Sequence, residues 1–217
     1  MPAQALKRFI AGFKRFQRNY FCSDHNLFEL LREGQAPRAL VIACSDSRVD
    51  PALLTDCNPG DIFVIRNVAN LVPPYGPDNN YHGVSAAIEY AVTCLEVEHI
   101  IILGHCHCGG ISSLMQSPGA EGKGEFIGNW MAIADKARMR VLHDLPGASV
   151  EVQERACEQA AILISLENLL SFPWIAERVD QQKLALHGWY FDLENGALSC
   201  YDVEAEAFIP LVRECSS

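Results

Sequence analysis

Three short apolar segments constrain the fold of this 217-residue chain more than any other feature. They span residues 39–43, 62–65 and 99–103, and a helical pattern over 84–95 lies between the second and the third. Strands that are buried on both faces read as continuous apolar runs, and a parallel sheet is covered by helices on both faces. The pattern therefore predicts an α/β fold with a central, mostly parallel β-sheet flanked by helices and joined by right-handed crossovers.

The later part of the chain reads as helices and one antiparallel edge. Helical patterns cover residues 126–142 and 150–170. Segments 183–190 and 196–203 read as strands on either side of a turn at 194–196, and an Asn-Gly pair in such a turn is typical of a β-hairpin. We expect these two strands to extend one edge of the sheet.

The first 34 residues are predicted to form an N-terminal helical arm in front of a single α/β domain, 35–217. Asp24 begins a second short helix over 26–32, which Gly34 closes. Before it, apolar and aromatic side chains recur at helical spacing with basic residues between them. These side chains are Leu6, Phe9, Ile10, Phe13, Phe16 and Tyr20. This stripe has no local element to bury against, so two readings stay open: packing on a partner subunit, or packing on its own domain.

Composition narrows the class of protein. The formal net charge of -10 argues against a nucleic-acid partner, and no apolar run approaches the roughly 18 residues that cross a membrane. The basic N-terminus lacks the apolar core of a signal peptide, with a transit peptide as the alternative. The nine cysteines are odd in number and scattered, which fits a reducing compartment better than a disulfide framework. We therefore expect a cytoplasmic protein with no nucleic-acid or membrane partner.

Metal-ligand side chains follow two of the apolar segments. Cys44 directly follows the first, and residues 104–110, Gly-His-Cys-His-Cys-Gly-Gly, follow the third. In parallel α/β sheets, functional groups gather beyond the carboxyl ends of the strands, so these clusters can meet in space. Thiolate and imidazole are the ligands that zinc prefers. Cys44, His105 and Cys108 are the expected ligands; because adjacent side chains point apart, Cys106 and His107 are left as spares.

Asp46 and Arg48 favour a catalytic site over a structural one. Four protein ligands close a structural zinc site, whereas three ligands leave a position for water. A carboxylate can accept a hydrogen bond from that water, and an arginine keeps the carboxylate ionised and oriented. The alternatives are a surface ion pair without a role, or a non-enzymatic zinc or redox module that uses Cys106 and Cys108, although Cys-x-Cys matches the redox motif poorly.

These motifs resemble a known family. Cys-Ser-Asp-Ser-Arg, followed about 60 residues later by His-x-x-Cys-Gly-Gly, is similar to the signature of the β-carbonic anhydrases. The likeness, of a plant-like subtype, covers roughly residues 20–205 and includes 63–70, 86–91 and 187–189. It implies a carbonate dehydratase, a zinc lyase that uses Zn²⁺ to hydrate carbon dioxide reversibly to bicarbonate and a proton. A hydrolase of carbonyl sulfide or carbon disulfide on the same scaffold is the nearest alternative, because such relatives keep the same ligands.

The resemblance also implies a substrate pocket and an assembly. The pocket residues would be Gln35, Phe63, Val68, Tyr90 and Gly109, although ordinary core packing is an alternative for the apolar ones. The assembly would be a homodimer or a higher homo-oligomer such as a tetramer. Gln35, Phe63 and Tyr90 would then reach the site of the neighbouring subunit.

Three positions depart from the family pattern. Cys106 replaces the usual Ser or Thr. Val41 and Phe191 stand where some members carry the Trp and Tyr of a non-catalytic bicarbonate site that switches the enzyme off at low pH, so we expect no such switch. His82 and His107 are the candidate proton carriers, since imidazole titrates near neutral pH.

Overall fold

The computed structural model describes residues 2–22, 27–116 and 124–213. The chain divides into two compact units, residues 1–36 and 37–217, two residues beyond the expected boundary at 34. Among the described residues no single helix is long and apolar enough to cross a bilayer. One pair of helices, bent by 92° at the break between them, passes that test jointly on length and composition alone.

The N-terminal unit contains helices α1 (Pro2–Phe21) and α2 (Leu27–Leu31). Asp24, the expected start of the second helix, lies outside the described residues. Phe28 of α2 packs against the C-terminal end of α1, with its ring centroid 5.6 Å from that of Phe16 and 5.8 Å from that of Tyr20. The expectation that the stripe has no local partner is therefore wrong for this end. Phe9 and Phe13 remain 69% and 63% exposed.

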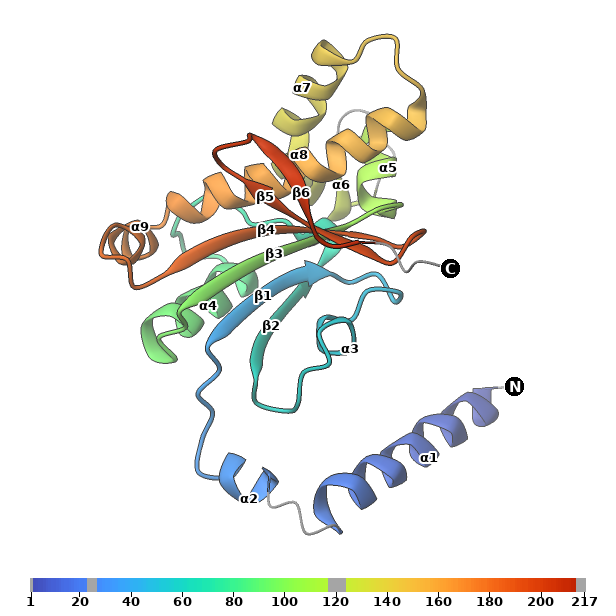
Figure 1. Cartoon of the computed structure of the whole chain (residues 1–217), viewed down its shortest axis with the longest axis vertical. Helices are drawn as coiled ribbons and strands as arrows, with labels where there is room; N and C mark the ends of the chain where they lie inside the picture. The colour runs from blue at the N-terminus through green and yellow to red at the C-terminus, as the bar shows by residue number, and fades with distance from the viewer. Residues whose placement is uncertain (1, 23–26, 117–123, 214–217) are drawn as a thin grey trace. The chain divides into compact units, whose positions relative to one another are not determined.

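The second unit is built on one six-stranded sheet of order β2-β1-β3-β4-β5-β6 (Figure 1). The strands are β1 (Ala39–Cys44), β2 (Ile62–Asn67), β3 (His99–His105), β4 (Ala185–Asp192), β5 (Ala197–Asp202) and β6 (Ala207–Val212). The first four pair in parallel, and β5 and β6 are antiparallel. This confirms the predicted α/β class, the mostly parallel sheet and the antiparallel edge.

Helices fill the connections between the strands. They are α3 (Pro51–Leu54), α4 (Gly83–Glu89), α5 (Gly109–Gln116), α6 (Ile127–Met131), α7 (Asp135–Asp144), α8 (Val150–Leu170) and α9 (Pro173–Asp180). Short 3₁₀ turns, η1 (Val68–Asn70) and η3 (Ala132–Ala134), and a π-helical turn, η2 (Tyr90–Cys94), accompany them. The helix α8 crosses the middle of the sheet and contacts both β3 and β4.

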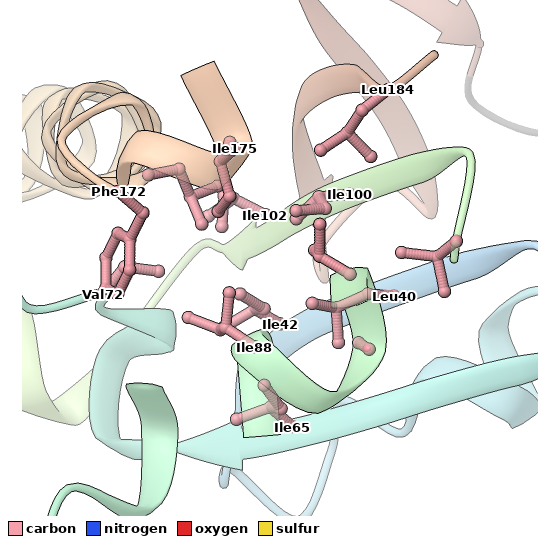
Figure 2. Packing of buried hydrophobic residues seen from close by; sticks show 14 of the residues in the cluster. Leu40, Ile42, Ile65, Val72, Ile88, Ile100, Ile102, Phe172, Ile175 and Leu184 are labelled. Carbon is pink, nitrogen blue, oxygen red and sulfur yellow. The ribbon is translucent and has the colours of Figure 1, made fainter. Parts of the chain in front are cut away.

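Both faces of the central strands are buried, which explains their continuous apolar sequence. Leu40 and Ile42 of β1 face a core shared with α4, α8 and α9, and Figure 2 shows them packed with residues of β3 and α9. Val41 and Ala43 face the opposite side, in a second cluster with Ile101. The alternation of side chains along a strand therefore delivers apolar residues to two cores at once.

Two elements add detail that the sequence pattern did not predict. The helical pattern over 126–142 is confirmed, but it forms three consecutive elements, α6, η3 and α7. Met131, Ala134 and Ala137 are all buried, and their spacing of three matches the period of a 3₁₀ turn better than that of an α-helix. The strand β6 was not predicted, because Pro210 lies within it; proline is tolerated in a strand at the edge of a sheet.

Candidate metal centre

Three metal-ligand side chains converge at the carboxyl ends of β1 and β3. Cys44 is the last residue of β1 and His105 is the last residue of β3. The two strands are neighbours and parallel, so their ends meet, and Cys108 lies in the turn before α5. The ligand atoms of Cys44, His105 and Cys108 all lie within 4.8 Å of one another, and all three residues are buried. The structure thus brings together the three ligands expected from the sequence.

The orientation of His105 leaves one ring nitrogen ready for a metal. Its Nδ1 lies 2.8 Å from the backbone oxygen of Cys106, which places the ring proton on Nδ1 because a carbonyl can only accept. Its Nε2 is buried and has no hydrogen-bond partner in the described part of the chain. A buried nitrogen that lacks a partner, beside two buried sulfurs, is the donor set expected for zinc.

The two cysteines are prepared for a cation. The neighbouring Cys108 lowers the pKa of the Cys44 thiol. The proximity of Cys44, together with burial, raises the pKa of Cys108. A divalent cation bound between the two sulfurs would hold both as thiolates.

Asp46 and Arg48 form a two-pronged ion pair beside the ligands. Arg48 Nε lies 3.0 Å from Asp46 Oδ1, and Nη2 lies 2.7 Å from Oδ2. Hydrogen bonds from Arg48 hold the pKa of the Asp46 carboxyl well below its usual range. The same guanidinium donates to the backbone oxygen of His107 at 3.0 Å. Arg48 therefore keeps Asp46 ionised and ties it to the turn that carries Cys108.

Arg66 has a supporting role that the sequence did not reveal. Its guanidinium donates to the backbone oxygens of Cys44, Asp46 and Val49 at 3.1, 2.6 and 2.8 Å, and forms an ion pair with Asp50 at 3.2 Å. These four contacts hold the loop after β1 against β2. Arg66 thus fixes the backbone on which the aspartate of the site stands.

The structure divides the expected pocket residues into two groups. Val68 and Gly109 lie at the same edge as the metal ligands. Gly109 directly follows Cys108 and begins α5. Val68 packs against the next residue, Gly110: a Cβ added to Gly110 would lie 2.9 Å from Val68 Cγ1. Phe63 and Tyr90 contact each other, with ring centroids 6.0 Å apart, but lie elsewhere. Phe63 pairs with Leu40, which lies four residues before Cys44 at the end of β1. Four residues of strand separate the two positions by about 13 Å. Gln35 belongs to the N-terminal unit.

The candidate proton carriers line different cavities. His82 Nε2 lies 2.6 Å from Asp78 Oδ1, in a cavity of about 670 Å³ that Val68 and Trp130 also line. His107 Nε2 lies 2.8 Å from Glu194 Oε1, beside a cavity of about 230 Å³ behind the ligands. His82 therefore shares a cavity with an expected pocket residue, and His107 does not.

Cys106, the residue that follows β3, turns away from the ligand set. Its Sγ accepts a hydrogen bond from the backbone N–H of Leu193 at 3.0 Å and lies 3.7 Å from Asp192 Oδ1. Burial raises the pKa of its thiol. Cys106 thus joins the turn between β4 and β5 instead of the metal centre.

Sequence reasoning missed a buried pair behind the centre. Glu158 of α8 accepts a hydrogen bond from the Cys108 N–H at 2.9 Å through Oε1, and one from the Tyr190 hydroxyl at 2.7 Å through Oε2. The available signal was an acidic residue on the apolar face of α8, next to Cys157 and one turn before Ile162. A charge at a core position is rare unless it is paired.

Comparisons with known proteins agree with this geometry. A family model described as carbonic anhydrase matches residues 39–198. The chain is 40% identical over 203 residues to Beta carbonic anhydrase 3 of Arabidopsis thaliana, which covers 92% of this chain and 78% of that protein. It is 39% identical over 204 residues to a carbonic anhydrase of Synechocystis sp., which covers 94% of this chain and 74% of that protein.

Solved structures give the same answer. The β-carbonic anhydrase CcaA is similar with a TM-score of 0.89 and 38% identity, over 95% of this chain and 99% of that one. This chain is also similar to a structure from a study of two tetrameric β-carbonic anhydrases of Sordaria macrospora, with a TM-score of 0.71 and 29% identity. The similarity covers 99% of this chain and 97% of that one. With the matched domain, the near-complete coverage and the zinc-type ligand set all in agreement, this chain belongs to the β-carbonic anhydrase family.

Proposed function

We propose that this chain is a carbonate dehydratase that catalyses the reversible, zinc-dependent hydration of carbon dioxide to bicarbonate and a proton. The observation that carries the proposal is the buried set of Cys44, His105 and Cys108 beside the ion pair of Asp46 and Arg48. Three ligands leave one position of a tetrahedral zinc open to substrate or water, as catalytic zinc sites require. An ionised carboxylate next to that position has no purpose in a closed structural site.

Zinc, when bound, supplies Lewis acidity that makes water a nucleophile near neutral pH. Two thiolates offset the charge of the ion, so this centre polarises water less than three imidazoles do, and help from the protein matters. Asp46 gives that help, because an ionised carboxylate only accepts hydrogen bonds. With zinc bound, Asp46 would accept a hydrogen bond from an O–H group beside the ligands, and Arg48 fixes the carboxylate in place.

We propose further that the site is shared within a homo-oligomer, either a two-fold dimer or a larger assembly such as a tetramer. Phe63 lies about 13 Å back along the strands from the end of β1 that carries Cys44, and Tyr90 contacts Phe63. This position favours a role at the metal centre of a second copy over a role at the centre of their own chain. The tetrameric relatives from Sordaria macrospora support a homo-oligomer.

A cytoplasmic location is part of the proposal. All eight cysteines in the described part of the chain are free thiols, including the exposed Cys22 and Cys94. Thiols persist in a reducing compartment, whereas secreted domains convert them to disulfides. The redox state of these cysteines in cell extracts, trapped by rapid alkylation, tests the location.

The direct test couples metal analysis to a hydration assay. Purified protein should contain zinc and should accelerate the acidification of carbon dioxide solutions in stopped flow. Carbonyl sulfide is the control substrate, with hydrogen sulfide release as the readout. Zinc-loaded protein that consumes carbonyl sulfide but leaves carbon dioxide unchanged would assign the sulfur-analogue hydrolase instead, and zinc-loaded protein inert to both would refute an enzymatic role.

A further inference from the structure

Glu158 is a buried ionisable residue that the proposed chemistry does not use. Glu158 lies in the middle of α8 and is only 4% exposed. Two glycines bring α8 this close to the sheet: a Cβ on Gly104 would lie 2.6 Å from the Ile162 side chain, and one on Gly188 would lie 2.9 Å from it. Glu158 stands one turn before Ile162, and so reaches the turn that carries Cys108.

The turn between His105 and Cys108 needs support. His107 has a φ of +55°, a left-handed conformation that is unfavourable for residues other than glycine. The side chains of Arg48 and Glu158 hold the turn. Arg48 donates to the His107 oxygen at 3.0 Å, and Glu158 accepts the Cys108 N–H at 2.9 Å.

Both oxygens of Glu158 are engaged by donors. Tyr190 of β4 donates its hydroxyl to Oε2 at 2.7 Å, and burial raises the pKa of Tyr190 so that the hydroxyl keeps its proton. Arg155 lies over the Tyr190 ring, with its Cζ 5.7 Å from the ring centroid, and pairs with Asp192 at 2.8 Å. The Glu158 carboxyl group is therefore fixed to the sheet through Oε2 and holds the turn through Oε1.

We propose that Glu158 is a positioning residue of the metal centre: by accepting the backbone N–H of Cys108, it holds the Cys108 sulfur at ligand distance from Cys44 and His105. The inference rests on the proposed zinc centre. Residues that orient metal ligands in this way commonly change metal affinity 10–100-fold when they are removed. What Glu158 supplies is a hydrogen-bond acceptor at a fixed place, and an amide oxygen can supply the same.

The test compares zinc affinity among four variants, measured by chelator competition, with the thiolate-to-metal absorption of the cobalt-substituted protein as a second readout. Glu158→Ala should weaken zinc binding about 10–100-fold and shift the cobalt band, because the Cys108 N–H loses its acceptor. Glu158→Gln should restore both properties to near wild type. Glu154→Ala is the matched control: Glu154 lies one turn earlier on α8 and accepts from Ser112 at 2.7 Å without contacting Cys108.

The outcomes are decisive in each direction. A folded Glu158→Ala variant with wild-type zinc affinity overturns the proposal. So does a Glu158→Gln variant as weak as Glu158→Ala, because charge and not an acceptor would then be required. An equal loss in Glu154→Ala would show a general effect of α8 and would also overturn it.

Tyr190→Phe covers the case in which Glu158→Ala does not fold. This variant removes one hydroxyl and leaves the contact between Glu158 and Cys108, so we expect a loss of zinc affinity smaller than 10–100-fold and a cobalt band displaced from that of the wild type. A wild-type band and affinity in Tyr190→Phe would count against the anchored carboxylate. Zinc binding is measured without substrate, so wild-type protein that binds zinc but fails to hydrate carbon dioxide would refute the proposed function alone.

Discussion

Ligand-type side chains meet at both ends of the parallel strands, but only one end forms a metal centre. At the carboxyl ends, three buried donors converge within 4.8 Å. At the opposite end, His99 of β3 and His187 of β4 lie with Nδ1 and Nε2 only 3.2 Å apart. In the described part of the chain, no third cysteine, histidine or carboxylate joins this histidine pair in a ligand group.

The two ends differ in the backbone that carries the ligands. At the carboxyl ends the chain turns through irregular backbone, so several donors from one short segment can face the same point. Arg48, Arg66 and Glu158 then fix that backbone from three directions. His99 and His187 instead project from regular strands, and the neighbouring positions of a strand point to the other face. At the carboxyl ends, the last residues of two neighbouring strands, Cys44 and His105, supply two ligands, and the turn after β3 supplies the third, Cys108.

The largest expected effect is the loss of zinc. Cys44→Ser, His105→Ala and Cys108→Ser should each abolish zinc binding, because each removes one of three ligands. The matched controls are Cys106→Ser and His187→Ala, which should keep about one zinc per chain. Elemental analysis after gel filtration measures the content. Loss of zinc from Cys106→Ser with retention in Cys108→Ser would reverse the assignment of ligands.

The second prediction separates chemistry from metal binding at the same edge. Asp46→Asn should keep zinc and lose about 100-fold or more in hydration rate, because the amide cannot act as a charged acceptor. Arg48→Ala should act similarly. Asp50→Asn is the control, since Asp50 is a second carboxylate in this loop that pairs with Arg66 and can still cap α3 as an asparagine. Near wild-type turnover in Asp46→Asn would reduce the ion pair to a structural role.

The third prediction concerns sharing of the site between chains. Asp46→Asn and Gln35→Ala are co-expressed after each is shown to be impaired alone. If Gln35 serves the neighbouring chain, one site of each mixed dimer gathers both defects and the other gathers none. Random mixing makes about half of the dimers mixed, so about a quarter of all sites should be intact. Activity that lies between those of the two parents would mean that Gln35 serves its own chain.

The fourth prediction asks whether the active edge also carries a regulatory anion site. Val41 and Phe191 occupy the positions of the switch residues. Arg66, on the strand next to that of Val41, already donates to three backbone oxygens and pairs with Asp50, so its guanidinium is not free to bind an anion. Hydration activity should therefore fall smoothly as pH decreases, and added bicarbonate should not deepen the fall beyond product inhibition. A steep, cooperative loss of activity that bicarbonate sharpens would contradict this.

The smallest effect is expected at the amino ends of the parallel strands, where His187 should change how the free energy of unfolding depends on pH. Burial, and then the charge of His99, lower the pKa of His187. The folded chain therefore binds fewer protons at this imidazole than the unfolded chain, so the free energy of unfolding should decrease as pH falls below the ordinary histidine range. His187→Gln should flatten this dependence between about pH 5 and 8. Urea unfolding of both proteins checks it, and parallel pH profiles would refute it.

The sequence by itself determined the central strands and the ligands, because both are local properties. The runs over 39–43 and 99–103 are apolar at every buried position, since β1 and β3 bury both faces. The ligands lie directly where those strands end. The Asp46–Arg48 pair, two residues apart, was also predictable, since short spacing alone brings the side chains together.

Only the tertiary structure decided the support of the site. Glu158 reaches Cys108 across 50 residues, and Tyr190 reaches Glu158 across 32. Both contacts depend on how closely α8 approaches the sheet at Gly104 and Gly188, which no local pattern records. The same holds for Phe63, a plausible pocket residue by resemblance, which strand register places well away from the ligands of its own chain. Local sequence fixes what each element is, whereas long-range packing fixes which elements touch, because contacts between distant residues depend on the shape of the whole core.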